Sequence, residues 1–292
     1  MAPRPRCRWL TPRTEAEPDL HLTPPPAAAE AAWARSSLVV VLIVLLAAAL
    51  VYLPALDNPL AFDDHYVLRD NSLLTSRDGL RRILTEPQLT SAPVYAHHYR
   101  PVVLLSFWAT ARLFGASIAV HRSINVLIHL ACALLVGLLA RHLLRGRGHS
   151  DAAARRSGLI AAALFALHPL GSVTINQIYK RTSSLADALI LLALLLVCRA
   201  VAGDRRRIGA WLAAIFVGAL AQVTKEHAAV LPLLALLYGH TAGLIRGRGK
   251  AWALMIVTLA GPQLVILALT FPREVVDRGW LPYLLVQPRV LF

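Results

Sequence analysis

The chain has 292 residues, of which 57% are hydrophobic and only 16% are charged, and its mean hydropathy is +0.57. This composition excludes an ordinary water-soluble domain and predicts an integral membrane protein. The net charge of +14 does not indicate nucleic-acid binding, because many arginines lie in short clusters between apolar runs and no nucleic-acid-binding motif is present. The three cysteines offer neither a disulfide framework nor metal-ligand spacing.

The amino-terminal segment has two parts. Residues 1–35 are rich in Pro, Ala and Arg and carry no periodic apolar pattern, so we expect a disordered cytoplasmic tail. The first apolar run, residues 38–53, follows basic residues but lacks a small-x-small cleavage site before a polar mature start. We therefore expect a retained signal-anchor helix, with a cleaved signal peptide as the alternative.

Six further apolar runs bring the number of candidate membrane spans to seven. They are residues 123–140, 158–178, 185–197, 208–223, 228–245 and 251–271. In the second of these, residues 158–167 alone would rise only about 15 Å, roughly half of a bilayer core. We therefore expect this span to continue, with a kink, past His168 and Pro169.

The run at residues 102–114 predicts a helix at the membrane interface, because it is short and contains Arg112. With this run excluded, the strongly basic connections all fall on one side of the membrane. The positive-inside rule then places the amino terminus in the cytoplasm and the loop at residues 57–122 outside. The predicted fold is an all-α polytopic membrane protein with about seven transmembrane helices and interfacial helices in this first outer loop.

Residues 36–272 therefore form one predicted membrane module, and residues 273–292 form a predicted outer tail. No internal sequence repeat is visible. The chain stops about 20 residues after the seventh predicted span, so a truncated product is one interpretation.

Two aspartates, Asp63 and Asp64, open the outer loop. Alone, such a pair is typical of a solvated loop start or a helix cap. The loop is too long for a simple connector, and residues 76–84 predict a short basic amphipathic helix with Ser76 as its cap. These surroundings favour a functional role for the pair.

Basic residues gather near the same predicted membrane face. Arg100 lies at the rim in "HHYRP", where it suits either lipid head-group anchoring or phosphate binding. Arg181 and the preceding lysine stand just before the fourth span, where snorkelling is the alternative. Lys225 and Glu226 lie between the fifth and sixth spans with almost no loop, where mutual pairing is the alternative.

Several motifs occur together in one order: "FDD", "YRP", "ALFALHP", a basic residue before the fourth span, and "TKE" followed by "AAVLPLLALL". In this combination the chain resembles, over residues 38–238, the transmembrane and tetratricopeptide-repeat (TMTC-like) family of protein O-mannosyltransferases and its bacterial relatives. It departs from them at "QIYKR", where relatives commonly have Trp and Gly, and it lacks their carboxy-terminal spans and repeats. The alanine and arginine richness is typical of a bacterial chain from a GC-rich genome.

The resemblance implies a C-type glycosyltransferase, a membrane enzyme that takes a sugar, here mannose, from a polyprenyl phosphate with inversion. It implies a hydroxyl acceptor on a protein or a glycan and a site on the outer, periplasmic face of the bacterial inner membrane, among membrane lipids. A non-catalytic scaffold or a degenerate fragment is the alternative. A transporter ranks third, because charges in the middle of the predicted spans are nearly absent.

The chemistry assigns roles within this resemblance. A hydroxyl is a weak nucleophile at neutral pH, so a carboxylate would serve as general base, and we prefer Asp63 for that role. The other aspartate would orient the first or bind a divalent cation, the one cofactor that the sequence leaves open. Fixed cations would stabilise the leaving lipid phosphate. The predicted residues are Asp63 and Asp64 for catalysis, Arg100, Arg181 and Lys225 for phosphate binding, and His98, His168 and Glu226 in support.

Overall fold

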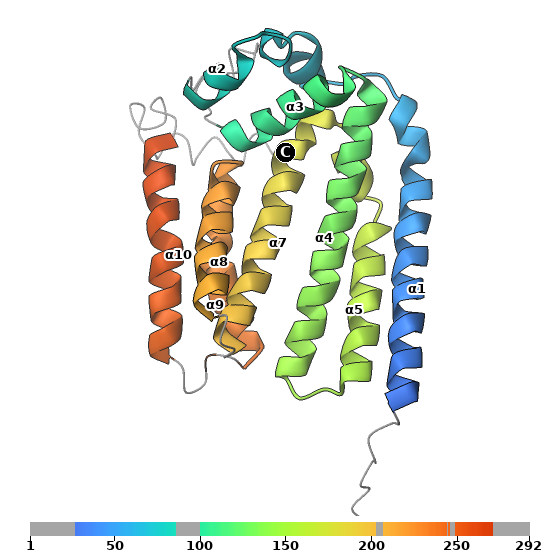
Figure 1. Ribbon diagram of the computed structural model, residues 1–292, viewed down its shortest axis with the longest axis vertical. Helices are drawn as coiled ribbons and strands as arrows, with labels where there is room; N and C mark the ends of the chain where they lie inside the picture. The colour runs from blue at the N-terminus through green and yellow to red at the C-terminus, as the bar shows by residue number, and fades with distance from the viewer. Residues whose placement is uncertain (1–26, 86–99, 203–206, 244, 246–248, 271–292) are drawn as a thin grey trace, which may run out of the picture. The chain divides into compact units, whose positions relative to one another are not determined.

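The computed structural model describes residues 27–85, 100–202, 207–243, 245 and 249–270 (Figure 1). All regular secondary structure in these residues is helical, as the sequence predicts. The chain divides into two units, residues 1–39 and residues 40–292. In the first unit the structure describes only the helical residues 27–39, and the arrangement described below concerns the second unit.

Ten α-helices and five shorter helical turns occur in these residues. The α-helices are α1 (Ala27–Tyr52), α2 (Gly79–Thr85), α3 (Pro101–Phe114), α4 (Ile118–Gly146), α5 (Asp151–Ala166), α6 (Gly171–Asn176), α7 (Arg181–Ala202), α8 (Arg207–Gln222), α9 (Leu231–Thr241) and α10 (Gly249–Thr270). The turns are η1 (Leu53–Asp57), η2 (His65–Arg69), η3 (Ser72–Leu74), η5 (Ile178–Lys180) and η6 (Glu226–Val230); η2 is a turn of π-helix and the other four are 3₁₀.

Three helical segments among the described residues are long and apolar enough to cross a membrane. They are Val39–Asp57, Ile118–Gly146 and Ile178–Val201. Shorter apolar helices occur at Pro101–Phe114, Ile208–Gln222 and Trp252–Ile266. These segments support a membrane protein, whereas the number of seven spans and the interfacial position of α3 stay predictions.

Two predicted boundaries of longer helices are wrong. The predicted kinked span at residues 158–178 is broken: α5 ends at Ala166, and α6 begins at Gly171. Pro169 between them has no backbone N–H to continue the helix, and His168 Nδ1 accepts a hydrogen bond from the Leu170 N–H in the intervening turn. The predicted tail is also too long, because α1 already begins at Ala27 in an alanine-rich stretch with high helix propensity.

The predicted cap of the short basic helix is also wrong. Helix α2 begins at Gly79, three residues after Ser76. The Ser76 hydroxyl instead donates to the Leu73 carbonyl of η3. A serine hydroxyl that bonds backwards along the chain stabilises the preceding turn and leaves the helix amides to other partners.

Helices α4 to α10 pack along one another in the second unit. Helix α4 contacts α5 and α7, α7 contacts α8, and α8 contacts α10. The backbones of α4 and α5 meet at two glycines: a Cβ on Gly137 would lie 2.8 Å from the Gly158 carbonyl oxygen. A large apolar core joins α7, α8, α9 and α10.

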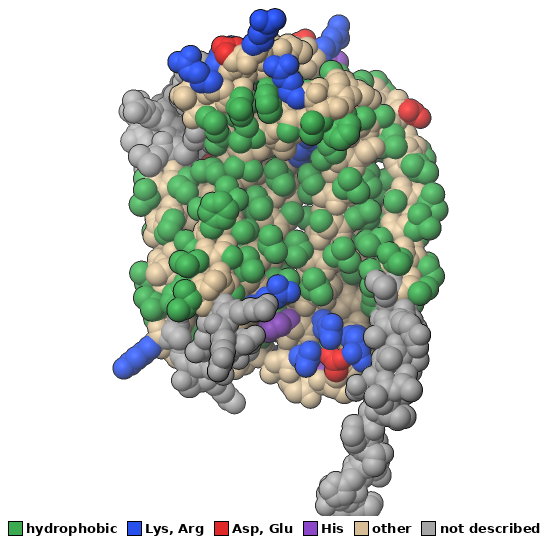
Figure 2. All heavy atoms as spheres, in the orientation of Figure 1, with side chains coloured by type: hydrophobic (Ala, Val, Ile, Leu, Met, Phe, Trp, Pro, Cys, Tyr) green, Lys and Arg blue, Asp and Glu red, His purple; other side chains and the backbone are tan. Residues whose placement is uncertain are grey.

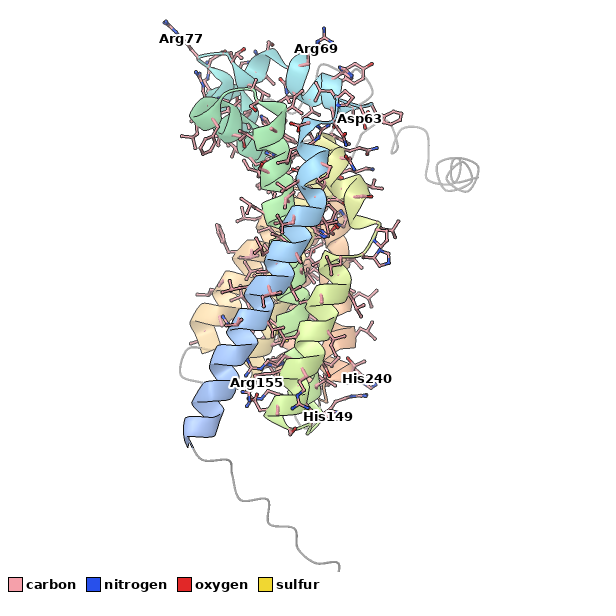
Figure 3. The ribbon with its side chains drawn as sticks, turned by 90° about the vertical axis from the view of Figure 1, so that its right-hand side faces the viewer. Asp63, Arg69, Arg77, His149, Arg155 and His240 are labelled. Atoms are coloured by element: carbon pink, nitrogen blue, oxygen red, sulfur yellow. The ribbon has the colours of Figure 1, made fainter. Side chains whose placement is uncertain are left out.

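Charged side chains lie at the two ends of these helices (Figures 2 and 3). The visible face carries a broad band of hydrophobic side chains between them. Asp63, Arg69 and Arg77 lie at one end, and His149 and Arg155 lie at the other, with His240 (Figure 3). This distribution is the one expected when a membrane surrounds the middle of the helices.

A helical cap covers the end that carries Asp63. We call η2, η3, α2 and α3 the cap; α3 lies across the ends of longer helices in Figure 1. The cap has its own apolar core, in which Val67, Leu73, Ile83 and Phe107 pack with Ile178 of η5. These contacts fix the start of α3 above the first turn of α7.

A buried arginine joins the cap to the helices below. The side chain of Arg181 is 0% exposed and donates to the Asn125 side-chain oxygen at 2.8 Å and to the His121 carbonyl at 2.6 Å. It also donates to the Thr110 hydroxyl of α3 at 3.2 Å and lies over the ring of Phe107, 4.5 Å from its centroid. Arg181 therefore connects α3, α4 and α7.

We expect Arg181→Ala to lower the free energy of unfolding by roughly 3–5 kcal/mol, because it leaves a cavity and several buried acceptors without a donor. The measurement is the thermal unfolding of the detergent-purified protein. Arg77→Ala, on the exposed surface of the cap, is the control and should change stability little. Equal unfolding temperatures for the two variants would contradict the structural role of Arg181.

Candidate active site

Polar side chains from four separate segments meet beneath the cap. The segments are the loop after η1, the start of α3, the junction of η5 and α7, and the turn between α8 and η6. We call these side chains the polar cluster, and it consists of Asp63, Arg100, Tyr179, Lys180, Ser183, Lys225 and Glu226.

A second buried arginine shapes the loop that carries the aspartates. Arg122 of α4 is 0% exposed and donates to the carbonyls of Asn58 and Pro59, the latter at 2.7 Å. It also donates to the Asn176 carbonyl at the end of α6, at 3.2 Å. These bonds satisfy carbonyl groups where η1 ends and so fix the point from which the loop departs.

The loop contains a strained residue directly before the aspartates. Phe62 has φ of +52°, in the left-handed region that non-glycine residues seldom occupy, and its side chain is 79% exposed. Such a conformation costs of order 1–3 kcal/mol, and residues of this kind cluster at functional sites. The strain at Phe62 therefore supports the adjacent Asp63 as a candidate site residue.

The two aspartates occupy different surroundings. Asp64 is 0% exposed, and its Oδ1 accepts a hydrogen bond of 2.8 Å from the backbone N–H of Tyr179. Its Oδ2 is buried without a hydrogen-bond partner among the described residues. Asp63 is partly exposed, and its charge acts on the phenol of Tyr179. Asp64 thus anchors the loop to η5, whereas part of Asp63 is open to solvent.

Arg100 and Glu226 form a two-pronged ion pair. Arg100 Nε lies 3.0 Å from Oε1 of Glu226, and Nη2 lies 2.8 Å from Oε2. The third nitrogen, Nη1, donates to the Tyr179 hydroxyl at 3.0 Å. Glu226, which the sequence placed in a supporting role, orients Arg100 through this bidentate pair.

The start of α3 explains the position of Arg100. Pro101 occupies the first turn of α3, and Arg100 immediately before it is non-helical, with φ of −129° and ψ of 62°. Burial lowers the pKa of Arg100, but its bonds to Glu226 and Tyr179 outweigh that effect and leave the pKa above its ordinary value. The guanidinium is therefore permanently charged and fixed in orientation.

Lys225, directly before Glu226 in the chain, is held by α7. Its Nζ donates to the Ser183 hydroxyl of α7 at 2.6 Å, and its backbone is extended just before η6. Its pKa is lowered, first by burial and then by the nearby charges of Arg100 and Lys180. An anion bound between these cations would relieve their mutual repulsion.

The remaining predicted residues lie elsewhere. Arg181 is fully buried in its bonds to α3 and α4, so it supports the cluster from below. His168 is exposed in the turn after α5, with its ring bonded to that turn. His98 lies outside the described residues. Within the described part of the chain, no group of three or more His, Cys, Asp or Glu side chains could hold a metal ion.

Sequence reasoning missed two parts of this arrangement. Tyr179 and Ser183 carry no motif of their own, and they become visible only through their bonds to Arg100 and Lys225. The pair of Asp187 on α7 and His227 on η6, 2.8 Å apart, was also missed. The sequence did contain a signal for this pair, because Asp187 is the one acidic residue in the candidate span Ile178–Val201.

Comparison with known proteins finds distant relatives. The chain is 29% identical to mouse protein O-mannosyl-transferase TMTC4 over 196 residues, which cover 61% of this chain and 26% of the relative. It is 27% identical to human protein O-mannosyl-transferase TMTC4 over 186 residues, 59% of this chain and 25% of the relative. It is 26% identical to the nematode Caenorhabditis elegans protein O-mannosyl-transferase F38B6.6 over 148 residues, 50% of this chain and 21% of the relative.

The chain spans about a quarter of the length of these relatives. No family model and no solved structure matches it. The similarity is distant, and it supports the resemblance to the TMTC-like family that the motifs indicated.

We expect the ion pair of Arg100 and Glu226 to be energetically coupled. Both side chains are largely buried, with 12% and 24% exposed. In a double-mutant cycle of Arg100→Ala and Glu226→Ala, the coupling measured by unfolding in detergent should be roughly 1–3 kcal/mol. The control cycle joins Arg145 and Asp151, which are 58% and 36% exposed and should give less than about 1 kcal/mol. Additive losses at Arg100 and Glu226 would refute the coupling.

Proposed function

We propose that this chain is the membrane module of a glycosyltransferase that moves a sugar from a polyprenyl-phosphate donor to a hydroxyl group. By analogy with the names of the relatives, the sugar is mannose and the acceptor hydroxyl belongs to a protein. A hydroxyl group of a glycan is the alternative acceptor. The names of the relatives indicate glycosyl transfer as the class of reaction of the family. The site would face the outer side of the membrane, as the basic connections predict.

The observation that carries this proposal is the meeting of fixed cations with an accessible carboxylate at one end of the apolar helices. Arg100 pairs with Glu226, Lys225 is the next residue along the chain from Glu226, and the charges of Arg100 and Lys180 both act on Lys225. Asp63 approaches the same cluster through Tyr179. A lipid phosphate at the membrane surface would meet these cations, while its sugar would lie within the reach of a base.

The reaction would proceed by one displacement at the anomeric carbon. The acceptor oxygen forms a bond to that carbon and gives its proton to Asp63, while the bond from the anomeric carbon to the phosphate oxygen breaks. The electron pair leaves with the lipid phosphate, whose negative charge increases. Arg100 and Lys225 would stabilise that charge where the membrane edge lowers the dielectric constant.

The other polar residues would support this chemistry indirectly. Glu226 and Tyr179 accept hydrogen bonds from the three side-chain nitrogens of Arg100 and so fix the plane of its guanidinium group. Arg181 holds α3, the helix that carries Arg100 at its start, through Thr110. We place Arg181 in this supporting role, because its guanidinium is buried among interior acceptors.

We expect Asp63→Asn to reduce transfer by roughly 10²- to 10⁴-fold without lowering membrane abundance, because it removes only the proton acceptor. The measurement is turnover of radiolabelled polyprenyl-phosphate mannose by the detergent-purified protein. Arg100→Ala should also reduce turnover and should weaken donor binding.

Asp64→Asn is the matched comparison. Asp64 accepts from the Tyr179 N–H in the interior, so its variant should lose stability as well as turnover. Full turnover in both aspartate variants would refute the proposed base. Binding of no lipid-linked sugar by the wild-type protein would favour a non-catalytic scaffold.

A further inference from the structure

The pair of Asp187 and His227 lies directly beside the polar cluster but has no part in the chemistry above. Asp187 is one helical turn after Ser183 on α7, and His227 is two residues after Lys225. Oδ1 of Asp187 lies 2.8 Å from Nε2 of His227. The polar cluster therefore continues along α7, from a Lys–Ser contact to an Asp–His contact.

The lengths of the helices explain why this pair lies beside α7 rather than above it. Helix α8 has 16 residues and rises about 24 Å, whereas α7 has 22 residues and rises about 33 Å. The turn after α8 therefore meets α7 along its side, at Ser183 and Asp187. Asp187 is six residues inside α7, about 9 Å from its first residue.

Stability does not explain a carboxylate at this place. The side chains of Asp187 and His227 are 53% and 38% exposed, and exposed pairs contribute little to stability in water. Against lipid, an ionisable group in an apolar span is costly, so such groups normally face a polar ligand or a water-filled path. The exposed face of this pair is therefore a candidate ligand-binding surface.

The hydrogen-bonding capacity of the pair indicates the chemistry of its ligand. An ionised carboxylate only accepts, so Nε2 of His227 carries the proton and donates to Asp187. In its neutral form the imidazole offers Nδ1 as a further acceptor in addition to the carboxylate of Asp187. Two adjacent acceptors suit the hydroxyl groups of a sugar, and the carboxylate repels a phosphate.

We propose that Asp187 and His227 bind hydroxyl groups of the sugar carried by the lipid phosphate. This inference rests on the proposed function, and it assigns the sugar-recognition site. Ser183 and Asp187 are four positions apart on α7, a rise of about 6 Å, which is comparable with the length of a hexose attached to a phosphate. The phosphate lies at Lys225 and the sugar extends along α7 to Asp187.

The test compares two ligands that differ only in the sugar, polyprenyl-phosphate mannose and polyprenyl phosphate, in equilibrium binding to the detergent-purified protein. Asp187→Ala should weaken binding of the mannose lipid roughly 10-fold or more, because hydrogen bonds to a charged group are lost. His227→Ala should weaken it roughly 2- to 10-fold, because a neutral acceptor is lost. Binding of polyprenyl phosphate should stay within about twofold of wild type. Lys225→Ala should weaken both ligands, and Asp78→Ala, on the exposed surface of the cap, should weaken neither.

Each other outcome overturns the assignment. Unchanged mannose-lipid affinity in both variants, equal losses for the two ligands, or a wild-type protein that does not prefer the mannose lipid would each exclude sugar recognition by this pair. Thermal unfolding of the same samples shows that the variants are folded. Turnover of the wild type and of Asp63→Asn, measured in parallel, tests the proposed function separately. Sugar-selective losses at Asp187 without wild-type turnover would leave a sugar-binding site without the proposed reaction, and a fully active Asp63→Asn variant would refute only the proposed base.

Discussion

The buried guanidinium of Arg181 is the interaction on which the arrangement of the cluster depends. Three helices that meet in an apolar environment leave backbone and side-chain acceptors that water cannot satisfy. Arg181 supplies donors to acceptors on α3 and α4 from the first residue of α7. The start of α3 is thereby held over α7, and Arg100 at that start reaches Glu226 and Tyr179.

The polar cluster also depends on the difference in length between α7 and α8. A hairpin of full-length helices would place its turn above the membrane, away from the side of α7. Because α8 is shorter than α7, the residues of its turn, Lys225 to His227, lie against the flank of α7. Charged groups are thus brought beside an apolar span, where the field of each is less screened than in water.

Local features of this fold could be predicted from the sequence. The apolar run at residues 102–114 became α3, with Pro101 in its first turn, because both depend on short-range propensity. The break after Ala166 was foreseen only as a kink, since the sequence shows a proline but does not show whether the helix resumes in line. The start of α1 was missed because composition suggested disorder where alanine favours helix.

The partners of the site residues could not be predicted, because they are distant in the chain. Arg100 and Glu226 are 126 positions apart, and Asp64 and the Tyr179 amide are 115 positions apart. The sequence therefore named the charged residues at this end but did not show that Glu226 pairs with Arg100. The sequence also could not show that Asp64 is buried and Asp63 is partly exposed, because this difference arises from the packing of Asp64 against η5.

The backbone of Phe62 has a consequence for the mobility of the loop. A glycine would adopt φ of +52° at little cost, but it would also allow many other conformations. The β-carbon of Phe62 instead makes this conformation unfavourable, so it persists only because neighbouring bonds hold the loop, from Arg122 to the Pro59 carbonyl and from the Tyr179 N–H to Asp64. If these bonds loosened, Phe62 would relax to negative φ and Asp63 would turn away from its present direction.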